Sequence, residues 1–405
     1  MQTVPEYKKR VQDMEQIMKQ KEMVRTKQKT QKVKNESMGH FHAIDSVSYN
    51  QSSLHQFLSA DYYGHVKLWD VGSNHACIWT RSKQGTCVTF DPTHPSAYAT
   101  IQKTRLQYGT IYKRISMYRT YVENAWDDSF SFPLDVDPEH FAYMPCVKQD
   151  GSTYLLSAMS HGQIAKWNTD SHLYDTFTIP VNRMDSDRSF PFLDQGKVAY
   201  SNDGSLFLYQ FQSCAYLFED ETKTPKTIFY TTRPINNENV VLEEEPEPEP
   251  EPENNQNEEK VIVPLDYSPS LHYDIRSCGV AFVPGTDNQR FVSVNRSYNR
   301  PKRCGMKWWD TKNPSKCIHH IDDYNGCFQF SMDGKRVLCA SMKKKMVLYD
   351  SETSKEIQDC GIRFITCMTR VEDTSQQYLI GDENSAIRLY DARLNQVVRV
   401  FSRSK

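Results

Sequence analysis

The sequence predicts an all-β fold, a β-propeller whose seven blades repeat around a ring. The first observation is a strand pattern, VKLWD at 66–70, in which apolar and polar residues alternate up to an aromatic residue. The second is its recurrence in segments that carry the aromatic anchors Tyr118, Trp167, Tyr209, Trp309, Tyr349 and Tyr390. The third is spacing, because consecutive anchors counted from Trp69 lie 49, 49, 42, 100, 40 and 41 residues apart. A period near 40 with one such strand per unit is typical of a radial repeat.

Composition fits this architecture. Of the 405 residues, 38% are hydrophobic, which is low for one compact core but suits a propeller, whose core is divided into thin layers between blades. The chain has no apolar run of 18 residues and no leader, so we expect an intracellular protein without a membrane span. Its 11 Cys include no C-x-x-C pair, which is typical of small buried thiols in a reducing compartment.

The charge is unevenly distributed, although the net charge is only −2. Residues 1–36 carry ten Lys or Arg against five Asp or Glu, whereas residues 243–260 carry nine Glu and one Lys. The rest of the chain is therefore close to neutral. Residues 1–36 have a positive electrostatic field, and residues 243–260 have a negative one.

Residues 1–38 are predicted to form a short amphipathic helix with a basic tail. The stretch from 6 to 34 has no Gly or Pro, and Tyr7, Val11, Met14 and Met18 fall on one helical stripe. Two interpretations stay open: the helix packs against its own propeller, or it binds a partner or nucleic acid.

The first repeat resembles the WD-repeat family. It has a Gly39-His40 pair, Ser59 on the second strand, and Trp69-Asp70 at the end of the third. The resemblance extends from Gly39 to the C-terminus, and it implies a buried hydrogen-bond relay among a His, a turn Asp, the Ser and the Trp. The positions expected for the turn Asp, 62 and 63, are Tyr, and later repeats lack an equivalent Gly-His pair. We therefore expect degenerate repeats and an incomplete relay, with stability resting on packing and strand ladders.

The interval of 100 residues before Trp309 predicts an insertion in the propeller domain, which spans 39–405. IFYTTR at 228–233 reads as an outer strand, and CGVAFV at 278–283 reads as the next inner strand. Between them, a Pro and Glu alternation predicts a disordered acidic insertion at about 236–262. After Tyr390 the segment NQVVRVF can supply blade seven with its own last strand, so the ring can close without a strand from the N-terminus.

No catalytic motif is present. The chain has no Gly-rich phosphate loop, no H-E-x-x-H, no G-x-S-x-G and no dinucleotide fingerprint. Cys317, His319 and His320 carry metal-binding atoms, but adjacent residues of a strand point to opposite faces, and no second cluster completes a tetrahedron. We expect no enzyme activity, no cofactor, no metal and no small-molecule substrate.

Basic residues gather in turns that are predicted to share one face of the ring. The turns between second and third strands emerge on the same face as the links between blades, and their basic residues are Lys103, Arg105, Arg296, Arg300, Lys302, Arg303, Lys343, Lys344 and Lys345. One interpretation is that these are ordinary solvated turns. The other, given Tyr62, Tyr63 and Tyr298 nearby, is a site for an acidic peptide, a phosphate or single-stranded RNA. The acidic insertion is expected to leave from this face and to screen it.

A second candidate site lies in the last repeat, on what we expect to be the opposite face. YLIGDENSAIRLYDAR at 378–393 resembles the box with which some WD-repeat proteins dock, as substrate receptors, on cullin-RING ubiquitin ligases. The residues that match the box are Gly381, Asp382, the pair Ile387-Arg388, Asp391 and Arg393, and Tyr390 takes the place of the usual Trp. The residues expected to contact an adaptor are Asp382, Tyr390, Asp391 and Arg393. Arg393 could reach an acidic groove on an adaptor, or it could pair locally with Asp391.

The sequence therefore predicts a non-catalytic scaffold or adaptor subunit of an intracellular multiprotein complex. The basic face and basic tail favour the nucleus and assemblies that handle RNA or chromatin. Two alternatives remain: a substrate receptor that docks on a cullin-RING ligase through the Asp391 and Arg393 box, and a direct reader of RNA or histone tails through the basic face.

Overall fold

The computed structural model describes most of the chain from Gly39 onward. The described ranges are 39–51, 55–72, 77–82, 85–94, 96–105, 111–120, 128–130, 138–159, 162–169, 171, 173–179, 196–211, 214–231, 275–297, 305–322, 324–341, 345–371 and 376–401. The predicted N-terminal helix (1–38) and the predicted disordered insertion (about 236–262) lie outside these ranges.

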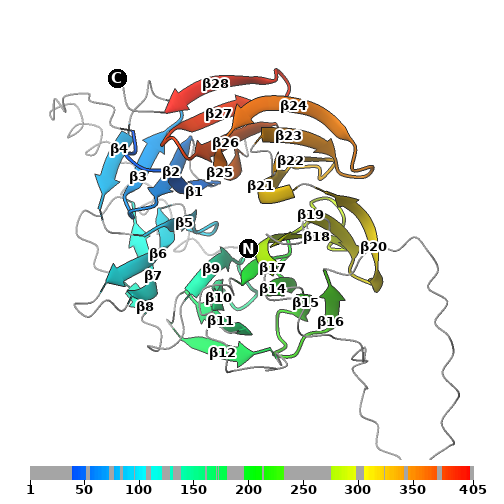
Figure 1. The fold of residues 1–405 in the computed structure, drawn as a ribbon. Helices are drawn as coiled ribbons and strands as arrows, with labels where there is room; N and C mark the ends of the chain where they lie inside the picture. Colours follow the sequence, from blue (N-terminus) through cyan, green and yellow to red (C-terminus); the bar gives the residue numbers. More distant parts are fainter. Residues whose placement is uncertain are drawn as a thin grey trace, which may run out of the picture.

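The described residues form seven four-stranded antiparallel sheets, arranged as blades around a ring (Figure 1). Blade 1 contains β1 (Ile44–Tyr49), β2 (Gln56–Asp61), β3 (Val66–Asp70) and β4 (Cys77–Arg81). Blade 2 contains β5 (Cys87–Phe90), β6 (Ala97–Arg105), β7 (Ile111–Arg119) and β8 (Asp128–Phe130). Blade 3 contains β9 (Pro138–Tyr143), β10 (Tyr154–Met159), β11 (Gln163–Asn168) and β12 (Tyr174–Thr178).

The remaining four blades follow the same order. Blade 4 contains β13 (Lys197–Tyr200), β14 (Leu206–Phe211), β15 (Cys214–Glu219) and β16 (Thr227–Tyr230). Blade 5 contains β17 (Ile275–Phe282), β18 (Arg290–Ser297), β19 (Gly305–Asp310) and β20 (Asn313–Ile321). Blade 6 contains β21 (Tyr324–Phe330), β22 (Arg336–Ser341), β23 (Lys345–Asp350) and β24 (Glu356–Arg363). Blade 7 contains β25 (Ile365–Val371), β26 (Gln377–Asp382), β27 (Ile387–Asp391) and β28 (Gln396–Phe401), so the all-β, seven-bladed prediction is confirmed.

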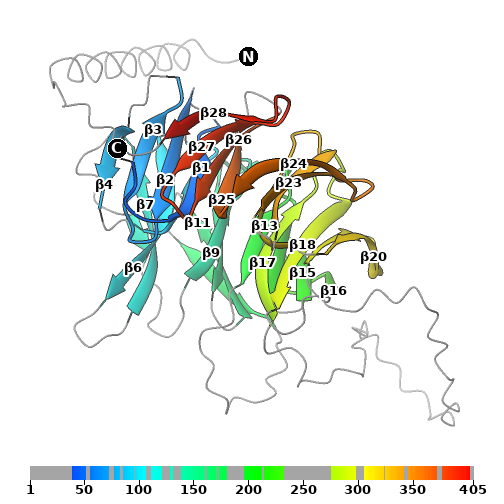
Figure 2. The ribbon, with the colours of Figure 1, turned by 45° about the horizontal axis from the view of Figure 1, so that its top comes forward.

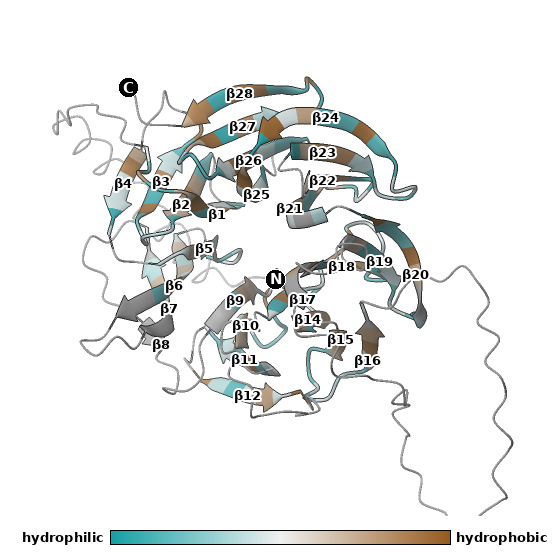
Figure 3. Cartoon of the chain, in the orientation of Figure 1, coloured by the Kyte–Doolittle hydropathy of each residue, from teal (hydrophilic) through white to brown (hydrophobic). Residues whose placement is uncertain are grey.

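The core is divided among the seams between blades. Each of seven buried apolar clusters joins two neighbouring blades; at the seam of blades 1 and 2, for example, Leu58 and Leu68 pack with Val88 and Tyr98. Outer strands such as β24 and β28 carry both hydrophobic and hydrophilic residues (Figure 3). The apolar content is therefore spread over thin layers, and packing between blades holds the ring together.

One predicted anchor is wrong. Tyr209 lies on β14, the second strand of blade 4, and the third strand is β15. In blade 1 Phe57 pairs with Trp69, and in blade 4 Phe207 pairs with Phe218, so Phe218 is the true equivalent of Trp69. The error arose because β14 and β15 are both rich in apolar and aromatic residues, and only strand pairing tells them apart.

Within the described residues the ring closes without an exchanged strand, an arrangement that the segment after Tyr390 allows. Each sheet uses four consecutive strands, so blade 1 and blade 7 meet only through side chains and isolated hydrogen bonds. At this seam the buried Phe401 ring lies 5.0 Å from the Phe57 ring and 5.9 Å from the Trp69 ring. The Arg399 guanidinium also donates to the carbonyl of Val71. These aromatic rings, together with aliphatic residues such as Leu379 and Ile387, therefore hold blades 1 and 7 together.

The predicted outer and inner strands on either side of the insertion are confirmed as β16 and β17. The segment 232–274 connects them and thus joins blade 4 to blade 5. A search of the described part of the chain finds no helix with the length and apolar character needed to cross a membrane.

Candidate partner-binding surfaces

The propeller has two faces, between which the strands run (Figure 2). The linker face carries the turns between second and third strands, such as 62–65, and the links between blades, such as 39–43 and Phe364. The opposite face carries the turns between first and second strands and between third and fourth strands. Side chains on these loops are held by rigid sheets, which is the arrangement that most binding sites on propellers and sandwiches use.

Blade 1 contains a complete hydrogen-bond relay, which corrects the prediction. Trp69 Nε1 donates to Ser59 Oγ at 2.7 Å, and Ser59 Oγ lies 2.5 Å from His40 Nε2. His40 Nδ1 lies 3.1 Å from Asp61 Oδ2, and all four side chains are buried. The turn Asp stands at position 61, the last residue of β2, and not at 62 or 63. Each buried polar group therefore has a partner, as low-dielectric surroundings require.

The Asp61 carboxylate also builds the turn on the linker face. Its Oδ1 accepts from the backbone N–H groups of Tyr63 at 3.1 Å and His65 at 2.9 Å, and the His65 ring lies 3.0 Å from Oδ2. Burial alone would raise the pKa of Asp61, but hydrogen bonds from His40 and from the His65 backbone lower it to about 2. Burial lowers the pKa of His40, because it disfavours the charged imidazolium. The His40 imidazole is therefore neutral, and the Asp61 carboxylate is charged.

Blade 7 repeats this turn with Asp382, one of the residues predicted for the adaptor box. Asp382 Oδ1 accepts from the backbone N–H groups of Asn384 and Ala386, both at 2.9 Å, and Oδ2 pairs with Arg388. Asp382 is fully buried, so its contacts are those of a structural turn on the linker face. The carboxylate in blade 7 therefore pairs with a cation, Arg388, whereas the corresponding carboxylate in blade 1 lies against two His side chains.

The other three box residues lie at the far end of β27, on the opposite face. Tyr390 is fully buried, and its hydroxyl donates to Asn395 Oδ1 at 2.8 Å. Asp391 is buried as well, and Arg393 holds it with Nε at 3.1 Å and Nη2 at 2.7 Å. The hydrogen bonds from Arg393 lower the pKa of Asp391. The predicted local pairing of Arg393 with Asp391 is thus present, and the four box residues do not meet at one place.

The predicted basic residues are only partly within the described chain. Lys103 and Arg105 end β6, Arg296 lies near the end of β18, and Lys345 begins β23. Lys345 Nζ forms an ion pair with Asp359 at 3.1 Å and lies 4.0 Å from Glu356, so two carboxylates neutralise its charge. The other members of the set, Arg300, Lys302, Arg303, Lys343 and Lys344, lie outside the described ranges, as does Tyr298.

Exposed aromatic residues mark the linker face of blades 7 and 1. Tyr62 and Tyr63 are 62% and 64% exposed in the turn of blade 1, and Phe41, in the link that precedes β1, is 54% exposed. Phe364, in the link before β25, is 43% exposed. The sequence reading noted the two Tyr and missed the two Phe, because a lone aromatic in a link carries no periodic signal.

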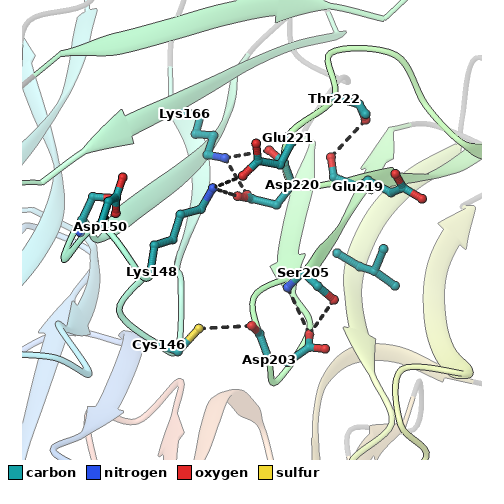
Figure 4. Close-up of polar contacts among 12 residues, drawn as sticks. Cys146, Lys148, Asp150, Lys166, Asp203, Ser205, Glu219, Asp220, Glu221 and Thr222 are labelled. Carbon is teal, nitrogen blue, oxygen red and sulfur yellow. Dashed lines mark hydrogen bonds and ion pairs between the residues drawn. The ribbon is translucent and has the colours of Figure 1, made fainter.

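A buried ion cluster, which sequence reading also missed, joins blades 3 and 4 on the opposite face (Figure 4). Asp220 follows β15 and is buried; its carboxylate lies 2.7 Å from Lys148 Nζ and 2.6 Å from Lys166 Nζ. Lys148 comes from the turn after β9 and also contacts Glu221 at 2.7 Å, and Lys166 lies on β11. The carboxylates raise the pKa of Lys148 despite its partial burial. This cluster links two blades through ion pairs among its own members.

Cys317, His319 and His320 lie on β20, where His319 pairs with Trp308 and His320 pairs with Lys307. Burial raises the pKa of Cys317 and lowers that of His319, so both favour their neutral forms. Over the described ranges, no three His, Cys, Asp or Glu side chains gather where they could hold a metal ion.

No protein-family model matches this chain, and a search of curated proteins finds no match either. The structure shows a seven-bladed propeller of small antiparallel sheets, an architecture consistent with a propeller of the WD type. The relay of blade 1 has the composition that the sequence resemblance implies. Propellers of this kind commonly mediate protein–protein interaction.

Proposed function

We propose that this protein is a non-catalytic scaffold or adaptor subunit of an intracellular multiprotein complex, and that the complex is nuclear. The observation that carries the proposal is the placement of exposed aromatic side chains on a loop surface that the sheets hold rigid. Tyr62 and Tyr63 stand on a turn whose backbone is fixed by the Asp61 carboxylate, and both residues are more than 60% exposed. Rigid aromatic side chains give a large contact area at low entropic cost, which favours protein binding.

Charge supports the nuclear part of the proposal. The chain is close to neutral overall, yet basic residues are frequent in the segments between second and third strands, and residues 1–36 add a net positive charge. Such a field attracts acidic peptides and nucleic acid, and both are abundant among nuclear assemblies. RNA or a histone tail is thus a partner that the same face could hold, with affinity that falls steeply with salt.

The second candidate function is substrate receptor of a cullin-RING ubiquitin ligase. The Arg393 side chain is 54% exposed although two of its nitrogens hold Asp391. A guanidinium fixed in this way presents its remaining donors to solvent on the opposite face, and a planar fork of this kind suits a carboxylate or carbonyl on an adaptor.

Affinity purification from native extract, with quantitative mass spectrometry, tests both functions. The wild-type chain is compared with Arg393→Ala, and each sample is also treated with nuclease. The scaffold function predicts one set of protein partners that the variant retains and that survives nuclease. Selective loss of cullin and adaptor subunits in the variant would favour the receptor function, and partners that vanish with nuclease would indicate binding through nucleic acid.

A further inference from the structure

The turn between β15 and β16, residues 220–226, carries an exposed threonine that is followed by a proline. The turn lies on the opposite face of blade 4 and begins with Asp220 of the buried ion cluster. Thr224 is exposed, and Pro225 is only partly buried. The sequence holds a second pair of this kind, Ser268-Pro269, which lies outside the described ranges. Within those ranges, Thr224 is therefore the hydroxyl residue that directly precedes a proline.

The backbone at Thr224 stands outside the strand ladders. Strand β15 ends at Glu219, and the chain returns to the sheet where the Lys226 N–H donates to the Leu217 carbonyl at 2.7 Å. Pro225 has no N–H, and the residue before a proline is restricted to extended backbone conformations. An enzyme that grips its substrate as an extended chain can therefore reach Thr224 without opening the sheet.

The two neighbouring threonines are engaged in the fold. The Thr222 hydroxyl bonds the carbonyls of Glu219 and Thr224, at 3.0 and 3.1 Å, so a bulky group on Thr222 would break the turn. Thr227 is the first residue of β16, where it pairs with Leu217. Both threonines are partly buried, whereas Thr224 is exposed. Within the described structure, Thr224 is thus the threonine of this turn that can take up a charged group and leave the turn and the ladder intact.

Two lysines flank Thr224 and can offset a negative charge there. Lys223 Nζ lies 3.5 Å from Asp175, and Lys226 Nζ lies 2.5 Å from Glu219; all four side chains are at least half exposed. Exposed ion pairs of this kind are weak because water screens them. A phosphate with a charge of about −1.5 to −2 can therefore compete with either carboxylate for its lysine.

We propose that Thr224 is a phosphorylation site for a proline-directed protein kinase. In the reaction, Thr224 Oγ1 attacks the γ-phosphorus of ATP, the bond between that phosphorus and its bridging oxygen breaks, and ADP leaves with the oxygen. The hydroxyl proton passes to the catalytic aspartate of the kinase. Because Pro225 offers no N–H and has a fixed φ, the class of enzyme that fits is one whose cleft accepts a proline directly after the hydroxyl residue.

This inference goes beyond the scaffold function. The reaction needs ATP and therefore rests on the intracellular location proposed above, but it does not depend on which partners the linker face holds. The phosphate would add its charge to the opposite face of blade 4, beside Lys148 and Asp220, and would leave the linker face unmodified.

Phosphorylation of the purified full-length chain in vitro tests the site. An active mitogen-activated protein kinase and, in a parallel reaction, an active cyclin-dependent kinase are each supplied with ATP. Fragmentation mass spectrometry of the chymotryptic peptide 219–229 then locates the phosphate. We expect phosphate on Thr224 with at least one of the two kinases. Pro225→Ala keeps the hydroxyl and should lower the initial rate of labelling at Thr224 by roughly tenfold or more, whereas the matched control Thr227→Val in the same peptide should leave that rate unchanged.

No phosphate on Thr224 of the folded chain with either kinase would overturn the proposal, whichever other residues are labelled. A synthetic peptide of residues 217–229 that is labelled while the folded chain is not would overturn it for a known reason, because the fold would then hide the turn. A Pro225→Ala rate within about twofold of wild type would overturn the assignment to a proline-directed kinase. None of these results changes the partner set found by affinity purification, so failure here and failure of the scaffold function are distinguishable.

Discussion

Asp61 and Asp382 make the same turn in two neighbouring blades. Each carboxylate accepts hydrogen bonds from the backbone two and four residues ahead, at 2.9 to 3.1 Å. They differ in their side-chain partners, which are His40 and His65 in blade 1 and the cation Arg388 in blade 7. The linker face of the two blades that close the ring is thus built on buried, fully bonded carboxylates.

Ser59→Ala should lower the free energy of unfolding by about 1–3 kcal/mol, because it leaves Trp69 Nε1 and His40 Nε2 buried without partners. Ser293→Ala in blade 5 is the matched control. Ser293 accepts from Trp309 Nε1 at 2.9 Å in the same way, but no His extends that bond in the described structure. Urea unfolding measures both; equal losses would mean that the His40 and Asp61 part of the relay adds no stability.

Acid should remove the stabilisation that Asp61 supplies. Its folded pKa is depressed to about 2 from 3.8, so the folded state favours the charged form more than the unfolded state does. This contribution, on the order of 2 kcal/mol, is complete above about pH 4 and is lost as the pH falls toward 2.

Asp61→Asn removes the titrating group and keeps an oxygen that can accept from the turn. The difference in unfolding free energy between wild type and Asp61→Asn should therefore shrink by roughly half of that contribution between pH 7 and pH 3. Urea titrations at both values measure it, and Glu352→Gln, at an exposed position, controls for the loss of one negative charge. If the difference in unfolding free energy between wild type and Asp61→Asn does not change with pH, Asp61 does not have a lowered pKa in the folded state.

Asp220→Asn should lower the free energy of unfolding by about 2–3 kcal/mol, because it leaves Lys148 and Lys166 partly buried without the Asp220 carboxylate. The neighbouring variant Glu219→Gln breaks an ion pair with Lys226 in which both side chains are at least half exposed, and it should cost less than about 1 kcal/mol. Chemical denaturation compares the two. Similar losses of unfolding free energy in the two variants would show that burial of the ion cluster between blades 3 and 4 adds nothing to stability.

Phe401→Ala should destabilise the protein by about 3–5 kcal/mol, because the ring fills the only seam that joins the two ends of the described propeller. Val398→Ala on the same strand, at a position 42% exposed, should cost less than about 1 kcal/mol. Thermal unfolding and limited proteolysis of blade 7 report the difference. If Phe401→Ala melts like wild type, the closure does not depend on aromatic packing.

The fold could be read from the sequence wherever a strand carries its own periodic signal. Trp69, Trp167 and Trp309 end third strands as predicted, because alternation and an aromatic residue are local properties. The same reasoning failed for blade 4, because two successive strands are apolar. Only the pairing of these strands identifies Phe218 as the equivalent of Trp69. The relay was missed for a similar reason: its Asp stands one residue earlier than expected, and that offset is settled only by strand register.

The candidate sites were less predictable, because they depend on contacts between distant residues. Lys166 and Asp220 are 54 residues apart and meet only when blades 3 and 4 pack together. Asp382 and Arg393 are close in sequence and lie at opposite ends of β27, so their nearness in the chain suggested one site where the structure has two. The exposed Phe364 shows no sequence pattern at all, and its exposure is known only from the structure.

The central claim is that the linker face holds the protein partners. The most direct measurement is a quantitative comparison of co-purifying proteins for wild type, for Arg300→Glu/Arg303→Glu on the predicted linker-face turn, and for Arg393→Ala on the opposite face. We expect charge reversal at Arg300 and Arg303 to deplete the main partner set at least fivefold, and Arg393→Ala to leave it unchanged. A partner set that survives the charge reversal and is lost with Arg393→Ala would contradict it.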